Sequence, residues 1–394
     1  MSARNPHVLV VHPGAELYGS DRVMLESVDG FLDRDWDVTV CLPFHGPLDA
    51  ELATRRVTTH HRPMPVLRKT HLSGRGVVRL LTATIRSIPR HWRLLRDVRP
   101  DVVYASTLTV PLWSLLGWLL RIPVLVHVHE AESAAPRVLR LGLSIPLLLA
   151  RRVVVNSRFS ASVIEEAVPR LAPRCVVVYN GVAGPPTPPD PPRDRLTGST
   201  RLLFLGRISE RKGILDIVET LDELTRRGRA VDLDIVGAVF PGYEAVEDEL
   251  RARIARLGLD HRVHRHGFDP DVWGHLARTD VLVVPSRREE PFGNTAVEGA
   301  LAARPVVVSD CGGLPEAVDG MHAARAVPAG APMRLADAIE RVIDDWPRFR
   351  DAAEADAAHA RTRFAPATYR SAIADEVADL FPPGSVRRIA SGAR

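Results

Sequence analysis

Short apolar runs alternate with helical stretches along this chain, and that alternation restricts its fold more than any other feature. Residues 281–286 and 305–309 are two such runs, and the stretch 296–302 between them has the composition of a short helix. Short runs that are apolar throughout are typical of strands buried on both faces of a sheet. Strands that alternate with helices form parallel sheets, so the chain is predicted to be an α/β protein with doubly wound sheets.

The alternation runs through both halves of the chain, and a proline-rich segment separates them. Residues 185–192 contain six prolines, which predicts a semi-rigid extended linker and a domain boundary. At 394 residues, the chain is long enough for two domains that each bury a core. We expect a first domain over 1–183, the linker over 184–195, a second domain over 196–365, a C-terminal helix over 366–380 and a disordered tail over 381–394. The expected strands are 7–12, 37–42, 101–104, 124–129, 153–156 and 175–179 in the first half, and 201–205, 234–237, 263–268, 281–286 and 305–309 in the second.

Composition narrows the class of protein further. Apolar residues make up 45% of the chain and charged residues 25%, which is ordinary for a soluble globular protein. The three cysteines, Cys41, Cys175 and Cys311, are far apart and odd in number, so neither a disulfide framework nor a metal-binding spacing is expected. We find no signal peptide pattern and no apolar stretch long enough to span a bilayer. A cytoplasmic protein is expected.

The loop between the two apolar runs carries the strongest indication of a binding site. It follows a strand and leads into a helix, and in an open parallel sheet such loops lie where ligands bind. The helix start suits a phosphate, and Gly293 would let the backbone approach it. Glu290 lies before the helix and Glu298 about one turn inside it. Two carboxylates beside an anion site are suited to accept hydrogen bonds from hydroxyl groups, one on a sugar and one on a ribose.

This stretch resembles the signature of glycosyltransferase family 4, in which a Glu, seven residues and a second Glu enclose a Phe-Gly pair. The resemblance covers about residues 7–380 and implies the GT-B fold, with two Rossmann-like domains facing a central crevice. It also implies metal-independent transfer of a hexosyl group, with retention, from a nucleotide diphosphate sugar to a hydroxyl acceptor. Cell-surface polysaccharide or glycolipid synthesis would be the setting. Between the two carboxylates, it assigns donor contacts to Phe292, Gly293, Asn294 and Thr295.

A cationic loop at the start of the second half fits the same interpretation. Gly206 and Arg207 follow an expected strand, and Lys212 ends the loop, so both cations can converge on an anion. Lys212 is one of only two lysines in a chain whose other cations are arginines. Two solvated surface cations would be the alternative, but in the family such a pair forms the diphosphate clamp.

Four further positions are carried over from the resemblance. Gly19 stands in the first glycine loop, and Gly267 with Phe268 stands beside the nucleotide base. His129, near the end of an expected strand, corresponds to a histidine that contacts the donor sugar, whereas His127 is expected to be a satisfied core histidine. No metal site is expected, because the histidine pair lacks a third ligand at a recognisable spacing. The Asp-x-Asp sequences at 33–35 and 232–234 lie in a turn and in a strand, and we reject both as metal ligands.

The segment 55–99 is strongly basic. It contains twelve Arg or Lys and one acidic residue, Asp97, and its later part predicts an amphipathic helix broken near Pro89. A basic amphipathic helix suits an anionic membrane surface, although a solvated helix face is the alternative. We expect peripheral contact with the inner face of the cytoplasmic membrane and a lipid-linked or saccharide acceptor; nucleic acid is not expected as a partner. The residues expected on this surface are Arg79, Arg86, Arg90 and Arg93.

Other functions remain open at this stage. A nucleotide-sugar epimerase with the same fold would act without an acceptor, and a sugar phosphorylase would need a lysine for pyridoxal phosphate, for which only Lys69 and Lys212 exist. A non-catalytic nucleotide-sugar-binding adaptor would bind the donor without turnover. The sequence leaves open the donor sugar, its base (UDP or GDP), the acceptor and the acceptor-activating base.

Overall fold

A computed structural model describes residues 4–17, 19–67, 74–239, 242 and 244–382. The chain forms two compact units, which we call unit 1 (Met1–Gly181 with Pro366–Arg394) and unit 2 (Val182–Ala365). The expected boundary at residue 183 lies two residues beyond the observed division. Lys69 and nearly all of the expected tail, from residue 383 on, lie outside the described residues.

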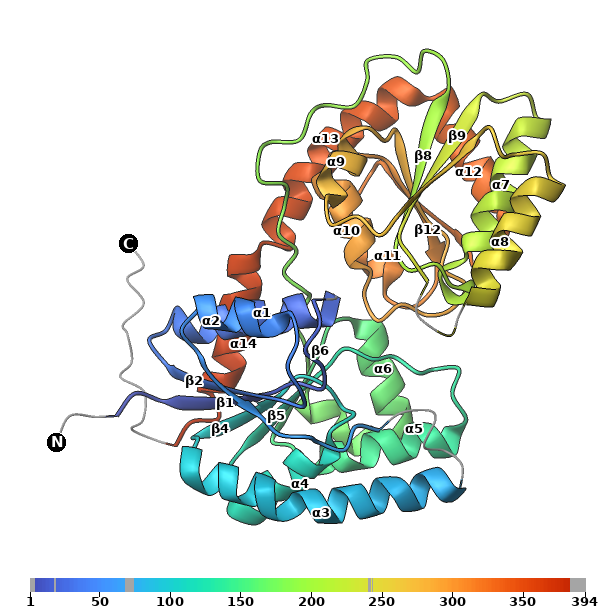
Figure 1. Cartoon of the computed structure of the whole chain (residues 1–394). Helices are drawn as coiled ribbons and strands as arrows, with labels where there is room; N and C mark the ends of the chain where they lie inside the picture. The colour runs from blue at the N-terminus through green and yellow to red at the C-terminus, as the bar shows by residue number, and fades with distance from the viewer. Residues whose placement is uncertain (1–3, 18, 68–73, 240–241, 243, 383–394) are drawn as a thin grey trace, which may run out of the picture. The chain divides into compact units, whose positions relative to one another are not determined.

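Unit 1 is built on a seven-stranded parallel sheet in the order β3-β2-β1-β4-β5-β6-β7 (Figure 1). Its strand order reverses between β1 and β4, as in doubly wound folds. The strands are β1 (His7–Val11), β2 (Asp37–Leu42), β3 (Thr58–His61), β4 (Val102–Ala105), β5 (Val124–Val128), β6 (Arg152–Val155) and β7 (Cys175–Val177). The helices are α1 (Gly19–Leu32), α2 (Leu48–Thr54), α3 (Gly74–Val98), α4 (Pro111–Leu120), α5 (Arg137–Ser144), η2 (Ile145–Leu149), α6 (Arg158–Ala167), η3 (Pro169–Arg174) and α14 (Pro366–Ala378).

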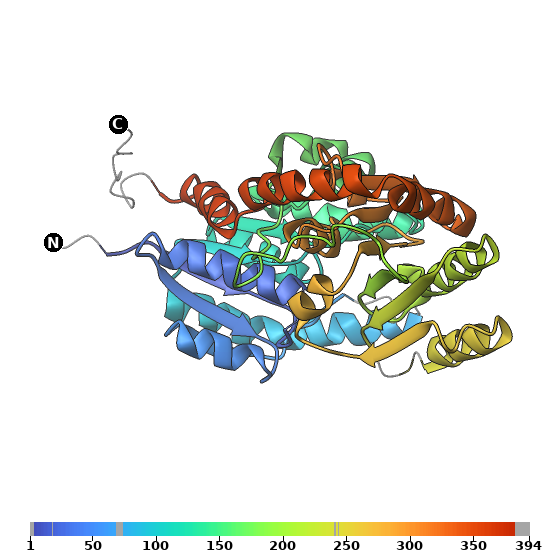
Figure 2. The same ribbon diagram turned by 90° about the horizontal axis from the view of Figure 1, so that it is seen from above.

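Alternating side chains of β1 build a separate core on each face of this sheet. Val8 and Val10 pack with apolar residues of α1, α2 and α14, whereas Leu9 and Val11 pack with those of α3, α4 and α6. Figures 1 and 2 show helices on both faces accordingly. Successive strand side chains point to opposite faces, so a strand that is apolar throughout must be covered on both.

The C-terminal helix α14 belongs to unit 1 and packs tightly against α1. Gly30 of α1 is required for this contact, because an added Cβ would lie 2.7 Å from the Arg370 carbonyl oxygen. The Arg370 guanidinium pairs with Glu26 at 2.7 Å, and the Tyr369 hydroxyl lies 2.5 Å from the Ser27 hydroxyl. The last helix therefore completes the core of the first sheet.

Unit 2 contains a six-stranded parallel sheet in the order β10-β9-β8-β11-β12-β13. Helices α7, α8 and α12 lie on one side of it, and α9 and α10 lie on the other (Figure 1). The strands are β8 (Thr200–Leu205), β9 (Val231–Val236), β10 (Val263–Gly267), β11 (Val281–Val284), β12 (Val306–Asp310) and β13 (Ala324–Pro328). The helices are η4 (Glu210–Lys212), α7 (Ile214–Arg226), α8 (Glu244–Arg256), α9 (Val272–Ala277), α10 (Asn294–Leu301), α11 (Leu314–Ala317), α12 (Pro332–Asp344) and α13 (Trp346–Arg363).

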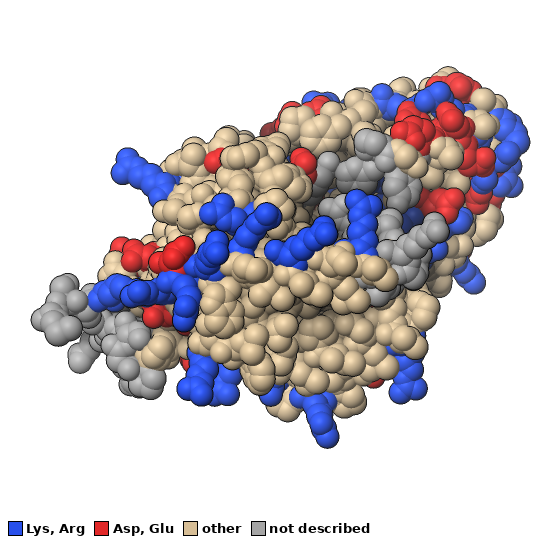
Figure 3. All heavy atoms as spheres, turned by 60° about the horizontal axis from the view of Figure 1, so that its bottom comes forward, with Lys and Arg blue, Asp and Glu red and all other residues tan. Residues whose placement is uncertain are grey.

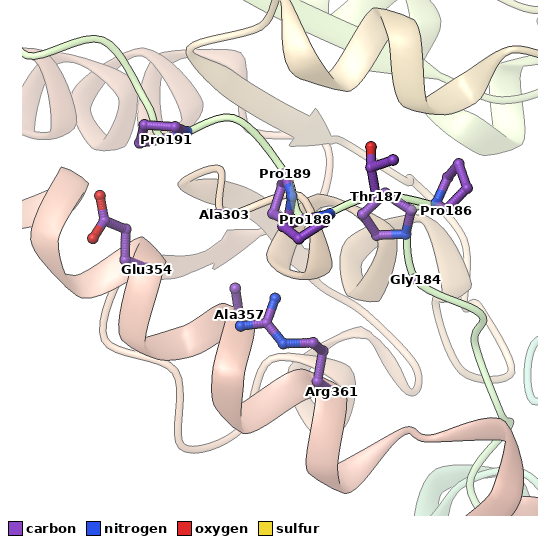
Figure 4. A pocket seen from close by; sticks show the side chains of 11 residues that line it. Gly184, Pro186, Thr187, Pro188, Pro189, Pro191, Ala303, Glu354, Ala357 and Arg361 are labelled. Carbon is purple, nitrogen blue, oxygen red and sulfur yellow. The ribbon is translucent and has the colours of Figure 1, made fainter.

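The proline-rich segment is docked on unit 2 and does not hang free. Figure 4 shows it running along α13, with Ala357 and Arg361 opposite the prolines across a cavity of about 560 Å³. Beyond the prolines, the Trp346 indole N–H donates to the Arg193 carbonyl oxygen at 2.7 Å. The Arg304 guanidinium donates to the Asp190 carbonyl oxygen at 3.0 Å. These contacts hold the connection in one path.

Three elements differ from the sequence-based expectations. The edge strands β3 and β13 were not predicted; β3 consists of Thr58, Thr59, His60 and His61, which form no apolar run. α3 runs unbroken through Pro89, because proline removes one backbone hydrogen bond and the others of this long helix remain. No helix in the described parts of the chain is both long and apolar enough to cross a bilayer.

A chain of buried polar groups links α1, β4, β5 and α14 inside unit 1. The Ser27 hydroxyl contacts the hydroxyls of Tyr104 and Tyr369, and the Tyr104 hydroxyl lies 2.6 Å from His127 Nδ1. His127 is fully buried, and its Nε2 has no hydrogen-bond partner among the described residues. Burial, together with repulsion from His129, places the pKa of His127 well below its ordinary value of 6.5. His127 is therefore a neutral core histidine that is hydrogen-bonded through Nδ1 and not through Nε2 among the described residues.

The stability of the protein should fall as the solution is acidified below about pH 6.5. In the unfolded chain His127 binds a proton there, whereas in the folded chain it stays neutral, so protons favour unfolding. The slope from this one group approaches about 1.4 kcal/mol per pH unit. Thermal unfolding followed between pH 8 and 5 (roughly the histidine range) should show a shallower decline for His127→Gln than for the wild type. The carboxyl groups are common to both proteins and cancel in the comparison, so parallel curves would contradict the assignment.

Candidate functional site

Three of the expected donor-binding residues of unit 2, Arg207, Lys212 and Glu290, lie at the point where its strand order reverses. β8 and β11 are neighbours in the sheet, and they pair in parallel. Arg207 and Lys212 follow β8, and Glu290 follows β11. Because all strands are parallel, both loops emerge at the same edge of the sheet, where ligands of doubly wound folds bind.

Lys212 and Glu290 form an ion pair across this point. Lys212 Nζ lies 2.9 Å from Glu290 Oε2, and the Ser286 hydroxyl donates to Glu290 Oε1 at 3.0 Å. Glu290 is buried, with 8% of its surface exposed. Burial alone would raise the pKa of Glu290, but the charges of Lys212 and Arg211 and the two hydrogen bonds bring that pKa below its ordinary value. The site thus holds an ionised carboxylate beside an ammonium group at neutral pH.

The loop that carries Lys212 is fixed against the end of β11. Gly213 has a φ of +70°, and an added Cβ would collide with the Pro285 carbonyl oxygen. The Arg287 backbone N–H donates to the Arg211 carbonyl oxygen at 2.9 Å, and the Arg287 guanidinium pairs with Asp216 at 2.7 Å. Both the close approach and the positive φ require glycine at position 213.

The loop that carries Glu290 is fixed from the other side, by the turn after β12. The Gly313 N–H donates to the Glu290 carbonyl oxygen at 2.7 Å, and Gly312, with a φ of +64°, lies against the Glu290 backbone. Gly293, with a φ of +125°, precedes the first residue of α10. The N-terminus of α10 therefore lies next to the Lys212–Glu290 pair along the same loop, and its N–H groups and dipole favour an anion.

The remaining expected donor residues fall into different environments. Arg207 and Phe268 are exposed, at the ends of β8 and β10; Phe268 exposes 72% of its surface. Glu298 is half-buried within α10. Phe292 is buried and its ring packs on Phe364 with centroids 5.5 Å apart, so its side chain belongs to the core and only its backbone is available to a ligand. The other expected positions, Gly206, Gly267, Asn294 and Thr295, lie at strand ends or at the start of α10.

In unit 1, Gly19 lies where the loop after β1 enters α1, and His129 lies at the carboxyl end of β5. Gly19 is exposed and is the first residue of α1. His129 directly follows β5, and its Nε2 is buried with no hydrogen-bond partner among the residues described. Burial, and then the neighbouring His12, lowers the pKa of His129 to about 3. A neutral imidazole with an uncommitted nitrogen can bind a hydroxyl group.

A second cluster in unit 1 was not anticipated from the sequence. His12 follows β1, Ser106 follows β4, and these two strands meet where the order of the first sheet reverses. His12 Nε2 lies 2.6 Å from Asp21 Oδ1, and His12 Nδ1 contacts the Ser106 hydroxyl. Asp21 lies in the first turn of α1, turned toward His12. The one signal in the sequence for this cluster was that His12 lies at the end of an expected strand, where polar residues can reach a binding site.

Comparison with known proteins identifies the family. Residues 18–183 match the family model described as Glycosyltransferase Family 4, and residues 199–345 match the one described as Glycosyl transferases group 1. The two matches fall in unit 1 and unit 2, respectively.

Similar proteins are known from sequence and from structure. The chain is 29% identical to glycogen synthase of Mycobacterium tuberculosis. The match covers 64% of this chain and 62% of that enzyme. It is 28% identical to the lipopolysaccharide core biosynthesis glycosyltransferase LpsD of Rhizobium meliloti, over 75% of this chain and 79% of that protein. The fold is similar to that of Anabaena HepE, with a TM-score of 0.80, 22% identity and coverage of 95% of this chain and 100% of HepE.

The chain belongs to glycosyltransferase family 4, and its two parallel-sheet units are those of the GT-B fold.

Proposed function

We propose that this glycosyltransferase moves a hexosyl group from a nucleotide diphosphate sugar to a hydroxyl acceptor, with retention and without a catalytic metal ion. The observation that carries the proposal is the contact of Lys212 with Glu290 at the reversal point of the second sheet. A cation suits a phosphate and a carboxylate suits sugar hydroxyls. A donor whose phosphate contacts Lys212 and whose sugar contacts Glu290 would have its sugar–phosphate bond near this pair.

Charge stabilisation is the main task of such a site. As the bond between sugar and phosphate breaks, negative charge builds on the leaving diphosphate. Lys212, Arg207 and the N-terminus of α10 would stabilise that charge, because preorganised cations and N–H groups do so without reorganisation. The loop contacts around Gly213 supply the preorganisation.

The two carboxylates would hold hydroxyl groups and would not transfer protons. Glu290 is ionised at neutral pH, since its pKa is below the ordinary value, and it can accept hydrogen bonds from the sugar. Glu298 would accept those of the ribose diol, and the neutral His129 would contact the donor sugar. We assign no general base; in family 4, attack on the front face assisted by the leaving phosphate is the usual explanation of retention.

Uridine diphosphate sugars are the first donors to test. Solved complexes of HepE contain UDP, UDP with glucose, or UDP-glucose. A thermal-shift screen that compares UDP and GDP sugars would identify the donor, because a ligand that binds only the folded state raises the unfolding temperature. No stabilisation by any nucleotide sugar would contradict the proposal.

The two carboxylates should respond differently to substitution. Glu298→Ala should weaken binding of the free nucleoside diphosphate by roughly 1.5–3 kcal/mol, because the ribose loses a charged acceptor. Glu290→Ala should reduce turnover more than nucleotide affinity, because Glu290 contacts the sugar. Calorimetry with the nucleoside diphosphate alone separates the two effects, and equal losses of affinity in both variants would refute the assignment.

Loss of the Lys212 ammonium group should lower the rate of sugar transfer, whereas removal of divalent metal ions should leave that rate unchanged. Lys212→Ala should lower kcat on the order of a hundredfold, by analogy with removal of one preorganised charge stabiliser. Lys212→Arg is the matched control, since it keeps the charge and should recover part of the rate. EDTA should leave the activity nearly intact, and complete loss that magnesium or manganese restores would show that the donor phosphates need a metal ion.

For the acceptor, we propose a lipid-linked sugar or another hydroxyl at an anionic membrane surface. On α3, the apolar residues Val78, Leu81 and Ile85 are exposed between arginines. The neighbouring α4 exposes Trp118 and Leu119. Figure 3 views unit 1 from the side on which α3 and α4 lie in Figure 1, and it shows Arg and Lys side chains around a broad uncharged area. Exposed apolar side chains with cations around them suit the interfacial region of a bilayer.

A cavity beside α3 supports the same proposal. It has a volume of about 430 Å³ and lies at the carboxyl ends of β1, β2 and β3. Phe44, Met64, Val66 and Leu80 give it apolar walls, and Arg79 lines it as well. An acceptor with an apolar part and an anionic group would fit this combination.

Charge reversal on α3 should release the protein from anionic vesicles. Arg79, Arg86, Arg90 and Arg93 are all exposed, and each cation near such a surface contributes roughly 1 kcal/mol. Changed together to Glu, they should abolish co-sedimentation with phosphatidylserine vesicles at low salt and leave nucleotide binding unchanged. A matched control changes four exposed arginines of unit 2, namely Arg251, Arg256, Arg278 and Arg334. The membrane proposal fails if the wild type does not co-sediment with the vesicles. It also fails if the unit 2 substitutions reduce co-sedimentation as much as the α3 substitutions do.

A further inference from the structure

Two histidines and one aspartate of unit 1 converge at the carboxyl ends of β2 and β3. His45 lies in the turn after β2, Asp49 lies in the first turn of α2, and His61 is the last residue of β3. His45 Nδ1 lies 3.2 Å from Asp49 Oδ2, and His61 Nε2 lies 2.8 Å from Asp49 Oδ1. The two imidazole rings approach each other with centroids 3.5 Å apart.

We propose that His45, Asp49 and His61 bind a divalent transition-metal ion, with zinc as the best match. Their ligand atoms all lie within 4.8 Å of one another, and no other group of His, Cys, Asp and Glu in the described ranges meets this condition. Imidazole nitrogens suit zinc and its transition-metal neighbours, whereas magnesium and calcium prefer oxygen ligands. Zinc bonds of about 2.0–2.2 Å place tetrahedral ligand atoms about 3.3–3.6 Å apart. The 3.2 Å distance between His45 and Asp49 is close to that spacing, and the 2.8 Å hydrogen bond between His61 and Asp49 would lengthen when an ion takes its place.

The Asp49 carboxylate is already held in place by a backbone donor. The Gly46 N–H donates to Asp49 Oδ2 at 3.0 Å, which fixes one oxygen. When a cation binds, the proton of each neutral ring would move to the other ring nitrogen, so that the nitrogen now facing Asp49 offers its lone pair to the ion.

The site would tie three separate segments of unit 1 together. The Leu48 N–H donates to the Ala15 carbonyl oxygen at 3.0 Å, and Gly46 lies so close to Ala15 that an added Cβ would collide with it. The start of α2 is thus packed on the loop that follows β1. An ion at His45, Asp49 and His61 would fix this start to the polar edge strand β3. Three protein ligands leave the fourth zinc position for water.

Metal binding can be measured directly on the full chain. The metal-stripped protein should bind one equivalent of Zn²⁺ in competition with a chromophoric chelator, and Co²⁺ should give visible absorption bands in its place. His45→Ala and His61→Ala should each weaken binding by at least about tenfold, since each removes one of three ligands. The His45 side chain is 80% exposed, so its loss leaves the fold intact. His60→Ala is the matched control, because adjacent strand residues point to opposite faces.

The measurement decides the proposal in either direction. Stoichiometric binding that is lost in His45→Ala and retained in His60→Ala establishes the site. Absence of stoichiometric Zn²⁺ or Co²⁺ binding by the wild type overturns it. Wild-type affinity in His45→Ala, or equal loss in His60→Ala, overturns it as well, because the ion would then lie elsewhere. The readout is binding, so the result is independent of whether donor transfer needs a metal.

Discussion

Parallel pairing of the strands is the constraint on which every candidate site in this protein depends. When neighbouring strands run in the same direction, the loops at their carboxyl ends emerge at one edge of the sheet. β8 and β11 pair in this way, which brings Lys212 to Glu290 from 78 residues away. The crossover helices that parallel pairing requires also cover both faces, so the same constraint buries the sheets and exposes their loops.

Both units use the reversal point of their sheet in the same manner. In unit 2, residues after β8 and β11 meet as Lys212 and Glu290; in unit 1, residues after β1 and β4 meet as His12 and Ser106. At each point a polar pair spans the ends of the two central strands. The chemistry differs, since unit 2 presents an ionised carboxylate beside a lysine and unit 1 presents the neutral imidazole of His129, whose nitrogen can serve as a hydrogen-bond partner. This division of charge agrees with a diphosphate held by unit 2.

Glycine and buried charge together make the donor loops rigid. Gly213 and Gly312 permit backbone approaches that any Cβ would block. A carboxylate as buried as Glu290 would be strongly disfavoured on its own, because burial penalises an unpaired charge. Lys212 and the Ser286 hydroxyl compensate it. The same groups that would bind the donor therefore also stabilise the empty site, which keeps it in one arrangement before the donor arrives.

The sequence by itself determined the fold class, the two-part organisation and the family. Apolar runs report burial on both faces of a sheet, and the spacing from Glu290 to Glu298 with the enclosed Phe-Gly pair is local enough to read directly. Only the tertiary structure decided which groups meet. It placed Asp21 beside His12, placed the Phe292 ring in the core and assembled His45, Asp49 and His61 from a turn, a helix and a polar edge strand. None of these follows from periodicity, because such contacts are set by strand order and side-chain packing across the sheet. β3 consists of two threonines and two histidines, so it has no apolar pattern from which a strand could be predicted.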